Sequence, residues 1–120
     1  MKRMCIAVLT TALLVTAVPP SAQADRRATR HEHLAISWAL GRPVRCDVVR
    51  ISTAARGWAL LYSRGRRSCG RYNANGYVVL ERRYGQWRDR YANSGTQNLP
   101  CSRVRPVPAK VGRDFGICVG

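Results

Sequence analysis

The spacing of apolar residues changes along the chain, from a helical period over residues 30–41 to a period close to two from Val44 onward. A capping box begins the helical segment, because Thr29 and Glu32 stand three residues apart and can each satisfy a free backbone N–H of the first turn. Gly41 ends the segment. We expect a short helix over about 30–41, with an apolar face supplied by Leu34, Ile36, Trp38 and Leu40.

β-branched and aromatic residues dominate after this segment, and their period of two is typical of strands. The links between the apolar runs are short, except for one long loop that contains Arg64 to Cys69 and Asn73 to Gly76. The predicted fold class is therefore α+β, with one N-terminal helix packed on a four-stranded antiparallel meander and a disulfide-stapled C-terminal tail. The expected strands cover about 45–52, 57–63, 76–83 and 87–92.

The last hairpin has a predicted register, because Gly85-Gln86 matches a two-residue loop whose first position needs a positive φ. Opposite charges and large apolar contacts across the hairpin favour this register. The facing pairs are Tyr84 and Trp87, Arg83 and Arg88, Arg82 and Asp89, Glu81 and Arg90, and Leu80 and Tyr91. The side under the helix then carries Val78, Leu80, Tyr84, Trp87 and Tyr91, and the solvated side carries Glu81, Arg83, Arg88 and Arg90.

The C-terminal tail is irregular after Ser94-Gly95 and rich in proline. Residues 107–115 can form one or two helical turns, which would place Val111 and Phe115 inward. Gly116 is the expected end of these turns.

The first 24 residues have the pattern of a secretory signal peptide. Lys2 and Arg3 precede an apolar run, and Ala22-Gln-Ala24 supplies the small residues that a signal peptidase needs. The alternative is a membrane anchor, but the run from Met4 to Val18 falls short of the roughly 20 residues needed to cross a bilayer. We therefore expect a secreted domain over 25–120, in which residues 25–30 have nothing to bury and are disordered.

Four cysteines remain after residue 24, an even number that predicts two disulfides in an exported chain. Three pairings are possible, and we favour the sequential one, in which each bridge contributes about 3 kcal/mol by the chain-entropy model. A metal site would need closely spaced cysteine pairs, which the sequence lacks. No metal or other cofactor is predicted. The four residues are Cys46, Cys69, Cys101 and Cys118.

Basic residues dominate the charge, with 21 Lys and Arg against 6 Asp and Glu and a net charge of +15. Arg64, Arg66 and Arg67 crowd the long loop near Cys69. The predicted register also opposes Arg83 and Arg88, an arrangement that costs stability unless an anion lies between them. These five arginines predict an anion-binding surface for wall polymer, anionic lipid headgroups or nucleic acid. The alternative is that an Arg-rich composition simply scatters solvated arginines over the surface.

Catalytic chemistry has few candidates, and no catalytic residue is predicted. Only His31 and His33 titrate near neutral pH without a large shift, and on a helix they point about 200° apart, so we expect both to be solvated. No serine lies in a G-x-S-x-G motif. A small secreted hydrolase, such as a ribonuclease, is the third functional expectation. Its candidate carboxylates are Glu32, Asp47, Glu81, Asp89 and Asp114.

The second expectation is a peptidase inhibitor or protein-interaction module. A loop anchored by a disulfide can enter another protein's cleft with little loss of entropy. The segment 63–76 fits this description, and its pair of arginines suits an acidic pocket. Tyr72 and Tyr77 near the same loop could instead stack on bases.

A set of short motifs resembles a group of short secreted actinobacterial proteins of unknown function. The motifs are a W-A strand at Trp58, a G-x-W-R hairpin at Gly85, and a closing tail in which Cys101 precedes the run from Val107 to Cys118. The resemblance covers about 44–118. It implies export, the strand pattern and a bridge between Cys101 and Cys118, and it implies no activity.

Overall fold

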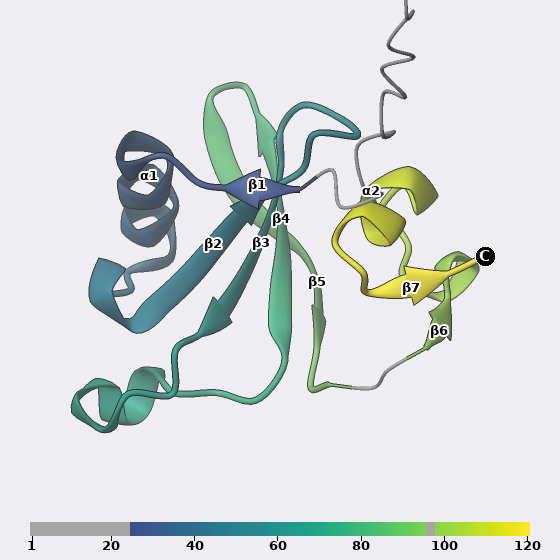
Figure 1. Cartoon of the computed structure of the whole chain (residues 1–120). Coiled ribbons are helices and arrows are strands. Elements are labelled where there is room, and N and C mark those ends of the chain that lie inside the picture. Colours follow the sequence, from purple (N-terminus) through teal and green to yellow (C-terminus); the bar gives the residue numbers. More distant parts are fainter. Residues whose placement is uncertain (1–24, 96–97) are drawn as a thin grey trace, which may run out of the picture.

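The computed structural model describes residues 25–95 and 98–120, and the predicted signal peptide lies outside them. The domain is a five-stranded antiparallel sheet with strands in the order β1-β2-β3-β4-β5. Helix α1 covers one side of the sheet, and the C-terminal tail covers the other (Figure 1). The strands are β1 (Arg26–Arg27), β2 (Asp47–Ile51), β3 (Trp58–Ser63), β4 (Tyr77–Arg83), β5 (Gln86–Asn93), β6 (Leu99–Pro100) and β7 (Cys118–Val119). The helices are α1 (Arg30–Leu40) and α2 (Ala109–Asp114), with 3-10 turns at Val44–Cys46, Arg67–Tyr72 and Cys101–Arg103.

The α+β class is confirmed, and each of the four expected strands lies within two residues of its prediction. The fifth strand comes from the segment that we expected to be disordered. Arg26 and Arg27 pair with the edge of β2. Asp25 binds Arg50 at 3.1 Å. The prediction of disorder over 25–30 is wrong because backbone bonds, ion pairs and the packing of Ala28 against the core under α1 order this segment.

The sheet carries a separate core on each side, as expected when successive side chains of a strand point to opposite faces. Both clusters draw on the central strands β3 and β4, whose neighbouring residues divide between them. The cluster between α1 and the sheet contains Ile36, Val49, Ile51, Ala59, Leu61 and Leu80. The cluster between the tail and the sheet contains Trp58, Leu60, Val79, Val104, Val107, Val111, Phe115, Ile117 and the Cys101–Cys118 pair.

Helix α1 begins with the predicted capping box and ends at Gly41 in the left-handed conformation. The predicted apolar face is only half right. Ile36 is fully buried, whereas Leu34 is 44% exposed and Trp38 is 89% exposed. Residues two apart on a helix point about 200° away from each other, so the pair Leu34 and Trp38 lies opposite the pair Ile36 and Leu40.

The β4–β5 hairpin turns at Tyr84-Gly85, one residue earlier than predicted. Both residues have positive φ, 52° and 74°, which is the conformation of a two-residue turn that fits the twist of the strands. Arg83 therefore faces Gln86, Arg82 faces Trp87 and Glu81 faces Arg88.

Moving the turn by one residue moves each cross-strand partner by two residues, so the side chains near the turn still share the predicted faces. A β-bulge between Val79 and Leu80 then offsets the two strands by one residue, so that Val79, and not Leu80 as predicted, faces Tyr91. Trp87 packs under α1, Tyr91 packs under the tail, and Tyr84 is fully exposed. The predicted opposition of Arg83 and Arg88 is wrong.

The tail follows its prediction closely. Helix α2 places Val111 and Phe115 in the core, and Gly116 with φ 70° follows it. Both sequential disulfides, Cys46–Cys69 and Cys101–Cys118, are present. Gly112 permits the second bridge, because a Cβ atom at this position would lie 2.4 Å from the Sγ of Cys118.

A buried carboxylate holds α2 against the sheet. The Oδ2 of Asp114 accepts hydrogen bonds from the Ser52 hydroxyl at 2.6 Å and from the Thr53 amide at 3.1 Å. Asp114 is only 7% exposed. The tail is thus tied to the turn that follows β2 by charge-assisted bonds as well as by apolar packing.

We expect Asp114→Ala to lower the free energy of unfolding by about 2–3 kcal/mol, because it leaves buried donors without an acceptor. Ser52→Ala removes only one of the bonds and should cost about 1 kcal/mol. Urea denaturation of the oxidised proteins measures both. Equal losses in the two variants would contradict the anchoring role of the carboxylate.

Candidate anion-binding surface

The basic loop, residues 64–72, connects the end of β3 to the approach to β4 and is fixed at several points. Cys69 is bonded to Cys46, which directly precedes β2. The Arg64 amide donates to the Cys46 carbonyl at 2.8 Å. The Asn73 side-chain amide donates to the Arg66 carbonyl at 2.7 Å. The loop is therefore held in one conformation by covalent and hydrogen bonds.

The arginines of this loop point into water. Arg64, Arg66, Arg67 and Arg71 are exposed, and none of them forms an ion pair with a carboxylate of the described residues. The Arg64 guanidinium donates to the main-chain carbonyl of Asp47 at 3.2 Å, and the Arg71 guanidinium donates to the Tyr72 hydroxyl at 2.8 Å. Arg71 was not among the predicted site residues, although its place between Cys69 and Tyr72 puts it in the same loop.

A buried ion pair supports the loop from beneath. The Asp47 carboxylate has no exposure to solvent and accepts two hydrogen bonds from Arg42, at 2.8 and 2.7 Å. Arg42 also donates to the main-chain carbonyl of Tyr72. Because Arg42 follows α1 and Asp47 begins β2, this pair joins the helix, the sheet and the basic loop.

The acidic residues elsewhere are mostly engaged. Asp25 pairs with Arg50, Glu32 with Arg26, and Glu81 with Arg83 and Arg90. The guanidinium group of Arg26 is the main cause that lowers the pKa of Glu32 to about 2. The net positive charge is therefore left on surface arginines, among them those of the basic loop.

Arg83 and Arg88 do not join this loop. They lie at the opposite end of β4, whose length separates them from the loop by about 20 Å. Arg83 is paired with Glu81, and Arg88 donates to the Gln86 side chain at 3.3 Å. The predicted site therefore divides into a basic loop whose arginines have no carboxylate partner and a distant hairpin in which Arg83 is paired with Glu81.

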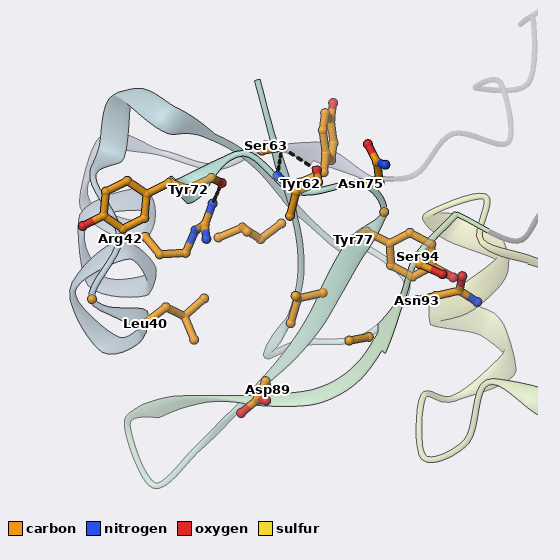
Figure 2. Close-up of a pocket in the computed structure, with 16 residues that line it drawn as sticks. Leu40, Arg42, Tyr62, Ser63, Tyr72, Asn75, Tyr77, Asp89, Asn93 and Ser94 are labelled. Atoms are coloured by element: carbon orange, nitrogen blue, oxygen red, sulfur yellow. Dashed lines mark hydrogen bonds between the residues drawn. The ribbon is translucent and has the colours of Figure 1, made fainter. Parts of the chain in front are cut away.

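A groove of about 570 Å³ adjoins the loop (Figure 2). Arg42 and Tyr72 lie at one end of it, and Tyr77 lies at the other with Asn93 and Ser94. The Tyr72 ring has the guanidinium carbons of Arg71 and Arg42 at 4.9 and 5.6 Å from its centroid. The Tyr77 ring packs on Tyr91 with centroids 6.2 Å apart. These rings are thus already engaged, which disfavours the expected stacking on bases.

The two histidines differ in their surroundings. His31 is exposed, whereas His33 is half-buried and its Nε2 is buried without a hydrogen-bond partner. Burial lowers the pKa of His33, and the charge of Arg64 lowers it further. The expectation that both histidines are solvated is wrong for His33, because it lies on the side of α1 that faces the basic loop.

Residues 25–95 and 98–120 contain no group of three or more His, Cys, Asp or Glu side chains placed to hold a metal ion. Within the same residues, no helix has the length and apolar character needed to cross a membrane. Comparisons with models of known families, with curated proteins and with solved structures found no match. The resemblance to short secreted actinobacterial proteins stays a prediction.

We expect Asp47→Asn to lower the free energy of unfolding by about 3 kcal/mol, because it leaves the Arg42 guanidinium without its counter-charge in a largely buried place. The double variant Arg42→Met, Asp47→Asn should lose less than the sum of the two single variants. Urea denaturation of all four proteins gives the coupling energy. A loss below about 1 kcal/mol for Asp47→Asn would place the pair among ordinary surface ion pairs.

Stability should fall as the pH drops below 6.5. The pKa of His33 is lower in the folded state than in the unfolded chain, so the unfolded chain takes up a proton first and is favoured between the two pKa values. Thermal unfolding at pH 7.5 and 5.5 should show a smaller difference for His33→Gln than for the wild type. His31→Gln is the matched control, and an equal change in both variants would contradict this role of His33.

Proposed function

We propose that this protein is a secreted, non-catalytic module that binds a phosphate- or carboxylate-bearing polymer or surface at or outside the cell. The observation that carries this proposal is the basic loop, in which four exposed arginines lack a carboxylate partner while the backbone is fixed. Guanidinium groups form paired hydrogen bonds to phosphate and carboxylate oxygens. A fixed loop loses little entropy when it binds.

Export is the part of the proposal that rests on the first 24 residues and the cysteines. The two disulfides are compatible with an oxidising compartment. A net charge of +13 remains when Lys2 and Arg3 are removed with the predicted signal peptide. This charge would attract the anionic polymers and lipids of cell surfaces over a distance of about 10 Å at moderate salt.

The inhibitor expectation has weaker support. A peptidase cleft that pairs with its ligand as an added strand needs an extended backbone. Residues 67–72 of this loop instead form 3-10 turns, with a break at Gly70. The loop geometry suits display of several cations better than insertion of one extended segment, so anion binding is the function that we put forward.

The test compares two triple variants of equal charge. Arg64→Gln, Arg66→Gln, Arg67→Gln alters the basic loop. Arg56→Gln, Arg103→Gln, Arg105→Gln alters three exposed arginines elsewhere that form no ion pair within the described residues. The protein is recovered from the medium of a secreting host, and its N-terminus is read by mass spectrometry.

Binding to wall polymer, to anionic vesicles and to duplex DNA is measured across a salt series. On duplex DNA each lost phosphate contact should lower the slope of log affinity against log salt by about 0.9, so the loop variant should lose about two to three. The control variant should keep nearly the wild-type slope. Equal losses in both variants on every ligand would mean that the charge acts diffusely, and the proposed site would be wrong.

A further inference from the structure

The side of α1 that faces away from the sheet carries large apolar groups in water. Trp38 is 89% exposed and Leu34, one turn earlier, is 44% exposed. Tyr84, at the tip of the β4–β5 hairpin, is fully exposed. Exposed single hydrophobic residues are common, but a tryptophan and a leucine in one helical stripe, next to a hairpin whose turn carries an exposed tyrosine, indicate a contact surface.

A groove runs between this stripe and the start of β5. It has a volume of about 750 Å³. Helix α1 contributes His31, Leu34 and Trp38, and the hairpin contributes Gly85, Trp87 and Arg88. The lining contains no carboxylate, although Glu32 lies on the same helix, because Glu32 is turned to Arg26.

Positive charge surrounds this apolar face. Arg30 stands one helical turn before Leu34, and Arg82 faces Trp87 across the hairpin. Arg30, Arg82 and Arg88 form no ion pair within the described residues. The surface therefore combines aromatic side chains that suit a polar–apolar boundary with guanidinium groups that have no carboxylate partner and suit anions.

We infer that this face, defined by Leu34, Trp38 and Tyr84, binds the headgroup region of an anionic lipid membrane. Tryptophan and tyrosine favour the membrane interface, and neighbouring arginines gain about 1 kcal/mol each near an anionic surface. A second copy of the chain is a poorer occupant. A two-fold interface would set Arg30, Arg82 and Arg88 against like charges from the other subunit.

The basic loop lies where it can meet the same membrane. Arg42, directly after α1, contacts Tyr72 of the loop, and α1 and the teal segment 67–72 both lie to the left in Figure 1, away from the tail. The electrostatic part of this inference rests on the proposed function, whereas the aromatic part is independent of it. Aromatic contact would add short-range binding that salt does not screen.

The experiment uses vesicles of phosphatidylglycerol and, separately, of phosphatidylcholine. Co-sedimentation should show binding to the first and little to the second. Tryptophan emission should shift to shorter wavelength on binding. Trp38→Ser should weaken binding to phosphatidylglycerol vesicles about tenfold and reduce the emission shift. Val119→Ser, which removes another exposed apolar residue on the tail, is the matched control and should bind like the wild type.

The loop variant Arg64→Gln, Arg66→Gln, Arg67→Gln separates this inference from the proposed function. If Trp38→Ser loses vesicle binding and the loop variant does not, the aromatic face stands and the loop proposal fails. If the loop variant loses binding while Trp38→Ser binds like the wild type and keeps the same shift of tryptophan emission, the inference is overturned and the loop proposal stands. Equal binding to both vesicle types, or self-association that Trp38→Ser abolishes in sedimentation, would also overturn the inference.

Discussion

The buried ion pair between Asp47 and Arg42 is the interaction on which the arrangement of this domain depends. The Asp47 carboxylate has no exposure to solvent, and it accepts two hydrogen bonds from Arg42. The next residue back, Cys46, is bonded to Cys69. A buried ion pair contributes little net stability compared with apolar packing, but losing one partner is costly. Its role here is to fix where the helix end and the basic loop lie relative to β2.

The tail has the same combination of a buried carboxylate and a disulfide on the other side of the sheet. Asp114 lies between Cys101 and Cys118 in sequence and bonds to Ser52 and Thr53. A chain of this size buries only part of its surface, so disulfides supplement its two small cores. Because five of its six carboxylates, all but that of Asp89, are used for internal contacts, the arginines of the basic loop have no internal counter-charge. The structural use of the acids thus creates the cationic surface.

Local signals predicted the parts of the fold that local physics determines. The capping box at Thr29, the stop at Gly41 and the turns of α2 each depend on neighbouring residues. The predictions were wrong where two possible structures differ only by one residue in the position of a turn, or by which face of a helix is buried. Either Gly85 or Tyr84 could open the hairpin turn, and Trp38 has the apolar character of a core residue. Only the packing of the whole sheet decides between such alternatives.

The candidate site shows why an arginine count is a poor guide to a binding surface. The five predicted arginines are alike in sequence, but Arg83 is paired with Glu81, and Arg88 lies with it at the end of β4 that is far from the basic loop. The three in the basic loop keep their charges free, because the acid nearest to them, Asp47, is already satisfied by Arg42. What distinguishes a site from an Arg-rich composition is therefore the placement of the carboxylates. In this chain that placement depends on long-range contacts, which sequence spacing does not reveal.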